Sequence, residues 1–218
     1  MTEKLPTRRR VALRRLAIMA AVLFVINFFM HIGMLLPRQA IHEVEERSGT
    51  GWTRTVDRMW VPEIHTFHLA YLTQSENVTL FSSAYLTVLG WMPAFGNALD
   101  CSEEAPIHAG QSAMSRDEGA VWFFYGRVDD PEIERVEISL CAEEYDDRSY
   151  AQTGREVRRI MDVELLEQSG RRYFLVKDGR EWDYDRDNQP RPLVLGYNAA
   201  GEEIFCLDIQ EKNFSHWV

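Results

Sequence analysis

The sequence of 218 residues contains only three cysteines, and their spacing argues against two common kinds of site. Cys101, Cys141 and Cys206 lie 40 and 65 positions apart, with no CxxC motif and no histidine cluster beside them. Zinc sites and dithiol redox sites need closely spaced ligands or thiols, so neither is indicated. In an oxidising compartment one disulfide can form and leave one thiol over, while three reduced, buried side chains are the alternative. The sequence does not choose among the three pairings.

Charged side chains are absent from Leu16 to Leu36, a stretch of 21 residues. As a helix this stretch would reach about 31 Å, close to the ~30 Å hydrocarbon thickness of a bilayer. The sequence therefore predicts a transmembrane helix over residues 16–36. A cleaved signal peptide begins in the same way, but its apolar region is shorter and ends at small residues, whereas Arg38 stands where a small residue is needed. We favour an uncleaved signal anchor.

Basic residues precede this stretch and acidic residues soon follow it. Positively charged flanks stay in the cytoplasm, which predicts a cytoplasmic N-terminus and an extracytoplasmic C-terminus at the cell membrane. The expected organisation is a basic cytoplasmic tail, a transmembrane signal anchor, a juxtamembrane stem and an extracytoplasmic domain, at residues 1–15, 16–36, 37–60 and 61–218.

The net charge of −10 divides unequally along the chain. Residues 1–40 contain seven Lys or Arg and one Glu, so residues 41–218 hold the remaining 17 basic and 33 acidic residues, for a net charge of −16. Such a domain repels a phosphate backbone, which argues against nucleic acid binding. Cations and basic partner surfaces are compatible with this charge, and a well-hydrated, soluble surface is the simpler interpretation.

Strand patterns dominate after residue 64. Phe67, Leu69 and Tyr71 alternate with smaller or polar residues, and Ser83–Trp91 is apolar on both faces, as expected of one interior strand. The strongest strand signal is Val121–Val128, which the turn residues Asp129-Asp130-Pro131 follow; then Val136, Ile138 and Leu140 alternate with polar residues.

The C-terminal part continues this pattern. Residues 157–165 fit either a strand or a helical stripe, and we favour a strand because Ser169-Gly170 then completes a hairpin with Tyr173–Val176. Asn198–Gly201 has the composition of a four-residue hairpin connection before Ile204–Ile209. Seven or eight short strands predict a mainly β fold: an antiparallel, immunoglobulin-like β-sandwich that follows the transmembrane helix.

A series of acidic residues is the candidate metal site. Asp183, Asp185 and Asp187 have the D-x-D-x-D spacing that gathers carboxylates in calcium loops. An EF-hand would continue with glycine at the sixth position and glutamate at the twelfth, where this sequence has Asn188 and Val194. A looser calcium site is the functional interpretation, which Asp146-Asp147 would join only if the fold brought the loops together. A solvated acidic loop is the simpler one.

Two further patterns suggest chemistry only weakly. His65 and His68 form H-x-x-H, but on a strand these side chains point to opposite faces, which argues against a metal pair. Ser112 lies in Gly-Gln-Ser-Ala-Met, which lacks the last glycine of a nucleophile elbow, and His108 nearby does not restore it. An envelope hydrolase is therefore the weakest of the hypotheses.

Six tryptophans are present, and they suggest two roles. Trp91 and Trp122 are expected to pack between sheets, although exposed tryptophans would suit a carbohydrate or partner platform. Trp52 and Trp60 follow the predicted span closely and are candidates for contact with the lipid headgroups.

The C-terminal half carries a resemblance. Gly126–Ile133 followed by Val136-Glu137-Ile138, then Arg172–Val176, then Leu195–Asn198 with Gly201 and Ile204-Phe205, resembles small uncharacterised exported or membrane-anchored proteins of Gram-positive bacteria. In those proteins a G-x-V-x-D-P-x-I strand pair precedes a final G-Y-D-x-x-G hairpin, and this chain has Asn198 in place of the aspartate. The resemblance implies a small β-sandwich at the outer membrane face and supplies no catalytic residue.

These observations lead to one main hypothesis and two alternatives. The main hypothesis is a non-catalytic, membrane-anchored interaction or accessory module whose outer domain docks to a protein or envelope partner. The first alternative is an acidic module that binds calcium through Asp183, Asp185 and Asp187; the second is the hydrolase. No organic cofactor is expected.

Overall fold

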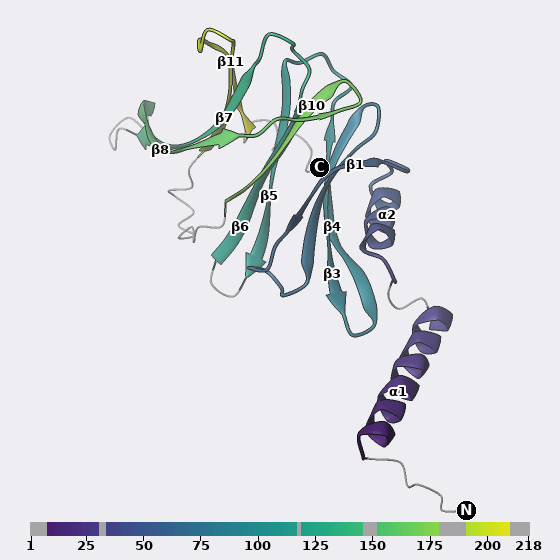
Figure 1. The fold of residues 1–218 in the computed structure, drawn as a ribbon. Helices are drawn as coiled ribbons and strands as arrows, with labels where there is room; N and C mark the ends of the chain where they lie inside the picture. Colours follow the sequence, from purple (N-terminus) through teal and green to yellow (C-terminus); the bar gives the residue numbers. More distant parts are fainter. Residues whose placement is uncertain (1–7, 31–33, 117–118, 146–151, 179–190, 210–218) are drawn as a thin grey trace, which may run out of the picture.

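The computed structural model describes residues 8–30, 34–116, 119–145, 152–178 and 191–209 (Figure 1). Two helices precede a chain of strands. The elements are α1 (Arg8–Met30), α2 (Pro37–Arg47), β1 (Arg54–Trp60), β2 (His68–Gln74), β3 (Val78–Thr87), β4 (Gly90–Asp100), β5 (Ile107–Arg116), β6 (Gly119–Val128), β7 (Arg135–Tyr145), β8 (Gln152–Val163), β9 (Leu166–Gln168), β10 (Arg171–Asp178), β11 (Arg191–Tyr197) and β12 (Glu203–Asp208).

The strands form three four-stranded antiparallel sheets. The first sheet has the order β1-β2-β3-β4, the middle sheet β5-β6-β10-β9 and the third sheet β12-β11-β7-β8. Every strand pair is antiparallel, and the first sheet is a simple meander. The prediction of a mainly β, antiparallel architecture is confirmed.

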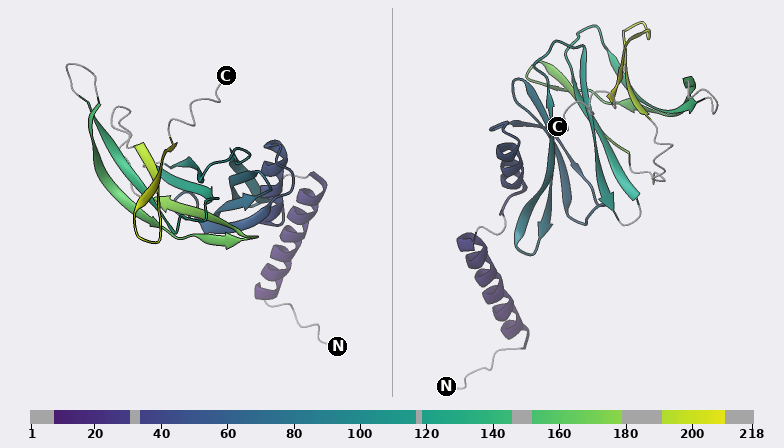
Figure 2. Two further views of the ribbon diagram at one scale, coloured as in Figure 1. Left: turned by 90° about the horizontal axis from the view of Figure 1, so that it is seen from above. Right: turned by 180° about the vertical axis from the view of Figure 1, so that it is seen from behind.

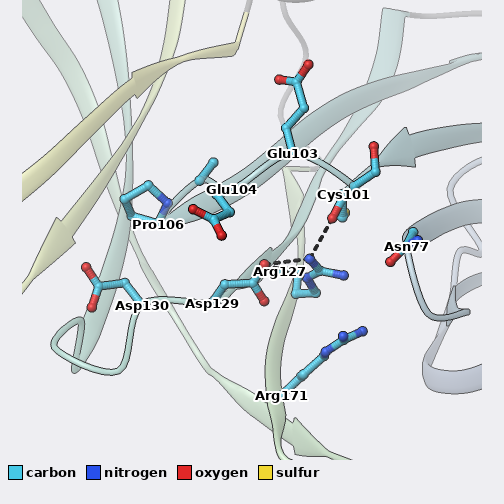
Figure 3. Close-up of a pocket in the computed structure, with 11 residues that line it drawn as sticks. Asn77, Cys101, Glu103, Glu104, Pro106, Arg127, Asp129, Asp130 and Arg171 are labelled. Atoms are coloured by element: carbon cyan, nitrogen blue, oxygen red, sulfur yellow. Dashed lines mark hydrogen bonds and ion pairs between the residues drawn. The ribbon is translucent and has the colours of Figure 1, made fainter.

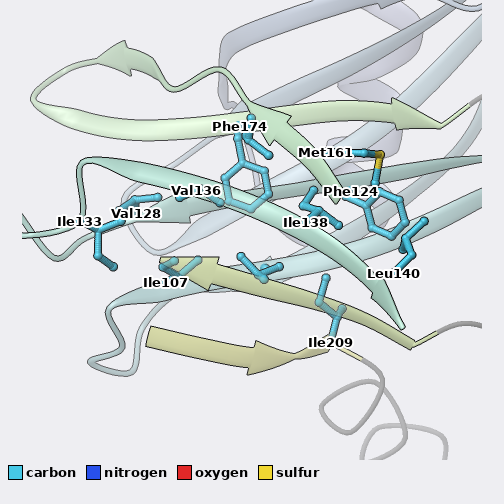
Figure 4. Packing of buried hydrophobic residues seen from close by; sticks show 13 residues of the cluster. Ile107, Phe124, Val128, Ile133, Val136, Ile138, Leu140, Met161, Phe174 and Ile209 are labelled. Atoms are coloured by element: carbon cyan, nitrogen blue, oxygen red, sulfur yellow. The ribbon is translucent and has the colours of Figure 1, made fainter. Parts of the chain in front are cut away.

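The middle sheet is apolar on both faces because it is covered on both sides. On β6, Val121, Phe123 and Tyr125 pack against the first sheet, in a cluster that includes Leu72 and Phe81. The alternate residues of β6 pack against the third sheet in a second cluster (Figure 4), whose members include Phe124, Val128, Val136, Ile138, Leu140, Met161 and Val194. Since successive strand residues face opposite sides, one strand serves two cores. The apolar run in the sequence is therefore explained by burial on both faces.

Helix α2 covers the outer face of the first sheet. Ala40 and Ile41 are fully buried and form a third cluster with Tyr71 and Ala84. A Cβ atom placed on Gly96 of β4 would lie 2.2 Å from Cγ1 of Val44, so only glycine allows the helix to approach this strand so closely.

A buried carboxylate fixes α2 to the start of β1. Glu45 is 0% exposed and accepts hydrogen bonds from the guanidinium of Arg38 at 2.5 Å and from the hydroxyl of Thr53. His42 Nδ1 lies 3.1 Å from the other carboxylate oxygen. Arg38 also donates to the backbone carbonyl of Thr53 at 2.5 Å. These bonds satisfy a charge that would otherwise be costly to bury.

Helix α1 projects away from the sheets, on the side of the first sheet that α2 covers (Figures 1 and 2). The helix predicted over residues 16–36 begins earlier, at Arg8, and is described to Met30, while residues 31–33 lie outside the described part. The predicted end at Leu36 is wrong, because Met34 pairs with Trp91 and Leu36 is extended. Within the residues that the structure describes, no helix is long and apolar enough to cross a membrane.

Local predictions can be compared with the strands. The single interior strand expected over Ser83–Trp91 is wrong: β3 ends at Thr87, a tight turn follows, and β4 begins at Gly90. Residues 157–163 are strand, as favoured, and the hairpins at Ser169-Gly170 and Asn198–Gly201 connect β9 to β10 and β11 to β12. The expected stem, residues 37–60, contributes α2 and β1 to the folded part.

Candidate functional site

A pocket lies where several strand ends meet, at one end of the first and middle sheets. We call this end the distal end. The pocket has a volume of about 420 Å³. The connection between β4 and β5, residues 101–106, forms one wall, and Asn77, Arg127, Asp129, Asp130 and Arg171 complete it (Figure 3). β3 starts at this end and β4 finishes there, since Val78 pairs with Asp100.

Arg127, at the end of β6, is the structural centre of the pocket. Its side chain is almost fully buried, and it donates to three separate segments. The guanidinium bonds Oδ2 of Asp129 through Nε at 3.0 Å and Nη2 at 2.5 Å, the carbonyl of Cys101 at 2.9 Å and the carbonyl of Glu76 at 3.3 Å. Arginine suits this position because its planar fork presents several donors at once. Arg127 therefore holds the β2–β3 turn, the 101–106 connection and the β6–β7 turn together.

Asp129 is shared by two basic side chains. Besides Arg127, its Oδ2 lies 3.4 Å from Nε2 of His108, which is buried on β5. This carboxylate orients the arginine and the histidine in the pocket wall.

Cys101 contributes packing rather than a nucleophile. The residue is buried, and burial raises the pKa of its thiol, an effect that exceeds the opposing influence of the Thr79 hydroxyl and of Arg127. Its Sγ lies 3.6 Å from Oγ1 of Thr79 and 3.4 Å from the carbonyl of Leu99. Since the thiolate is the reactive form, this cysteine is unreactive at neutral pH.

Arg171, the first residue of β10, borders the pocket from the middle sheet. It donates from Nη1 to the carbonyl of Glu76 at 2.5 Å, so both arginines of the pocket bind the same turn. Two residues later, the buried Tyr173 donates its hydroxyl to Oε1 of Gln74 at 2.7 Å, and burial is the main cause of its raised pKa. The floor of the pocket is thus a set of satisfied polar contacts.

The rim of the pocket is acidic. Glu103 and Glu104 are exposed on the connecting loop, and Asp129 and Asp130 border the other side. The cationic side chains below them bind backbone carbonyls or Asp129. The pocket therefore offers carboxylates to a ligand at its mouth, with hydrogen-bonding groups inside, and this arrangement suits recognition of basic groups.

The residues predicted from sequence as sites are dispersed. Asp183, Asp185 and Asp187 lie in residues 179–190, and Asp146-Asp147 in residues 146–151, both outside the described residues. In the part that is described, no group of three or more His, Cys, Asp or Glu side chains is arranged to hold a metal ion.

Ser112 and the histidines occupy structural positions. Ser112 lies inside β5, where its hydroxyl is 3.3 Å from Nδ2 of Asn97 and bonds Tyr125, so no strand–turn–helix elbow surrounds it. His108 lies four residues away on the same extended strand, at roughly 13 Å, too far for a catalytic pair. His68 is buried beside Tyr85, and burial, with a smaller effect of His65, lowers its pKa to about 4.

Of the described tryptophans, two pack against buried clusters and two are exposed. Trp122 packs between the middle and third sheets, as expected, whereas Trp91 packs in the cluster between α2 and the first sheet and not between two sheets. Trp52 is 74% exposed and stacks on His42 at 3.6 Å, while Trp60 contacts the ring of Phe67.

Sequence reasoning missed Arg127 as a site residue and assigned Asp129 only to a turn. One signal was present: a charged residue, Arg127, stands inside the apolar strand Val121–Val128, where burial demands a partner. No family model, curated protein or solved structure matches the chain, so the site rests on its geometry alone.

Proposed function

We propose that the chain is a single-pass, membrane-anchored interaction module whose outer domain binds a basic partner at the distal pocket, without catalysis. The observation that carries this proposal is the position of the acidic pocket. It lies at the distal end of the sheets, whereas the chain that leads from α1 joins the first sheet at the other end, through Met34 and Trp91. A pocket placed there would face away from a membrane that holds α1.

Two features of the N-terminal segment support the anchor. Seven large apolar side chains of α1 are at least half exposed and are spaced around the whole helix: Leu13, Leu16, Ile18, Met19, Val22, Phe24 and Val25. In sequence the uncharged stretch begins at Leu16, and the part of it before Met34, which pairs with Trp91, would be about 27 Å long as a helix, a length that suits a bilayer. The basic residues before it favour an N-terminus in the cytoplasm and sheets outside the cell.

The pocket supports binding rather than catalysis. The buried Arg127 and His108 both contact the carboxylate of Asp129, and burial raises the pKa of the Cys101 thiol. The immunoglobulin-like form of the sandwich, and the kinship with exported proteins of Gram-positive bacteria, belong to the same proposal.

The anchor is tested with the full-length protein in its membranes. We expect it to stay in the membrane pellet during alkaline carbonate extraction, and the sheets to be digested only by protease added on the outer side. Release by carbonate, or protection of the sheets from outside protease, would rule the anchor out.

Partner binding is tested with an oligo-lysine peptide as the probe and the full-length protein in detergent. A double variant, Glu103→Gln with Glu104→Gln, should weaken binding, and added salt should do the same. The charge-matched control is Glu43→Gln with Glu46→Gln on α2, which should bind as the wild type does. Equal binding by all three proteins would reject the pocket as the site.

A further inference from the structure

Among the described residues outside α1, five of the large exposed apolar side chains lie at the end of the first sheet opposite the pocket. We call this group the proximal patch: Leu35, Leu36, Trp60, Phe67 and Val88, with exposed fractions of 57, 60, 43, 47 and 89%. The patch combines the segment after α1, the β1–β2 connection and the tip of the β3–β4 hairpin. Apolar residues exposed together in this way mark an interaction surface.

Short contacts hold these three segments side by side. Met34 and Trp91 exchange two backbone hydrogen bonds, of 2.9 and 2.7 Å, so the chain leaving α1 is bound to the base of the hairpin tip. The amide of Leu86 donates to the carbonyl of Phe67 at 2.8 Å, and the ring of Phe67 meets that of Trp60 edge to face at 5.8 Å. The patch is therefore a formed surface of the first sheet.

The hairpin that bears Val88 is free of charge. Residues 77–99 contain no Asp, Glu, Lys or Arg, although residues 41–218 carry a net charge of −16. An acidic surface is repelled by anionic lipid, whereas an uncharged one with aromatic residues is suited to the zone between headgroups and acyl chains. Near the patch, Glu63 is paired with Lys177 at 2.6 Å, which reduces its charge effect.

The connection to α1 is too short to keep this surface away from a bilayer. Three residues lie between Met30, the last described residue of α1, and Met34, so the two Cα atoms can be at most about 14 Å apart. Figures 1 and 2 show the β3–β4 tip beside the end of α1 that leads into the domain. A membrane crossed by α1 would therefore meet the hairpin tip.

We propose that the proximal patch inserts into the outer lipid interface, with Val88 as the deepest residue, and so holds the domain upright with the pocket facing away. This inference rests on the proposed anchor, because α1 brings the patch to the bilayer. Lipid is the proposed occupant of the patch, and the test below distinguishes lipid from a second copy of the chain.

The test uses the full-length protein in vesicles of phosphatidylcholine with a minor fraction of phosphatidylglycerol. An environment-sensitive fluorescent amino acid replaces Val88 in one sample and Glu132, on the exposed β6–β7 turn at the other end, in a control sample. With acyl-brominated phosphatidylcholine, the probe at 88 should shift to the blue and lose most of its emission, while the probe at 132 should be unchanged.

The outcomes separate the two proposals. If the protein floats with the vesicles and resists carbonate but the probe at 88 is unquenched, the inserted patch is rejected and the anchor stands. If the protein does not float with the vesicles, both are rejected. A blue shift that disappears on dilution of the protein in the vesicles and is insensitive to bromine would identify a second copy as the occupant and overturn the inference.

A paired substitution provides an independent check on the same surface. Val88→Glu places a charge at the tip, whereas Val88→Thr keeps the size and shape of the side chain without a charge. With bromine-labelled lipid, quenching of tryptophan emission should fall in the glutamate variant and be retained in the threonine variant. Equal quenching in both would contradict insertion at Val88.

Discussion

The two ends of the first sheet are built from opposite kinds of residue. At the proximal end the hairpin tip is uncharged and apolar, and its backbone is joined to the segment that follows α1. At the distal end two arginines bind the same backbone turn beneath an acidic rim. Strand β3, of ten residues, connects these ends over about 34 Å. A single sheet can therefore carry a surface suited to lipid at one end and a surface suited to a charged partner at the other.

Loss of Arg127 is the substitution that should break the distal end most completely. Arg127→Met removes the donor of the Cys101 carbonyl, leaves the Glu76 carbonyl with Arg171 alone and leaves the carboxylate of Asp129 with His108 alone. We expect the free energy of unfolding to fall by about 3 kcal/mol, as measured by urea denaturation. Arg171→Met removes the exposed hydrogen bond to Glu76 and the contact with the Tyr173 hydroxyl, and should cost about 1 kcal/mol. Similar losses in the two variants would show that Arg127 does not organise the pocket.

The contact between α2 and the first sheet can be broken at its buried carboxylate. Glu45→Ala removes the buried acceptor for Arg38 and Thr53, so we expect a loss of about 2 to 3 kcal/mol in the free energy of unfolding, measured by thermal or urea denaturation. The neighbouring Glu46→Ala, on the exposed face of α2, should change stability by less than about 0.5 kcal/mol. A mild effect of Glu45→Ala would mean that α2 docks through its apolar side chains alone.

Acidification should loosen the proximal end first, through His68. Burial holds the pKa of His68 at about 4 in the folded protein, below its ordinary value of 6.5, so the unfolded chain binds the proton more tightly. The contribution of His68 to stability is complete above pH 6.5 and is lost as the pH falls from 6.5 towards 4. Between pH 7 and pH 5 the wild type should therefore lose more stability than His68→Gln. Parallel pH profiles for the two proteins would refute this role of His68.

At the hairpin tip, substitutions should have the smallest effect on folding. Val88 is 89% exposed, so Val88→Glu and Val88→Thr should each change the free energy of unfolding in detergent by less than about 0.5 kcal/mol. The comparison separates stability from lipid contact, since only the glutamate variant should lose contact with the bilayer. A large destabilisation by either substitution would assign Val88 to the core of the domain.

Much of the strand content could be predicted, because the alternation of apolar and polar residues and the residues typical of turns are visible within short stretches of sequence. The hairpins at Ser169-Gly170 and Asn198–Gly201 follow from such signals. Two features could not be predicted in this way. Val121–Val128 is apolar on both faces, which indicates burial but does not show that a sheet lies on each side. Within Ser83–Trp91 the apolar run hides a turn, which the Thr87 hydroxyl stabilises by donating to the carbonyl of Gly90 at 2.9 Å.

The polar sites were harder to predict because tertiary contacts create them. Glu45 occurs among exposed glutamates and becomes buried only because Arg38 and Thr53 meet it in the fold. Arg127 joins segments about 26 and 51 residues away, and no local pattern indicates those partners. The candidate calcium residues Asp183, Asp185 and Asp187 were chosen from spacing alone and remain a prediction.

The central claim is that the domain stands on the membrane by its proximal end with the pocket away from the lipid. Energy transfer to an acceptor in the outer leaflet tests it directly, with a donor at position 104 in one sample and at position 88 in another, both in full-length protein in vesicles. We expect strong energy transfer from a donor at position 88 and weak energy transfer from a donor at position 104, because the sheet between them is ~34 Å long. Equal transfer from the two positions would contradict it.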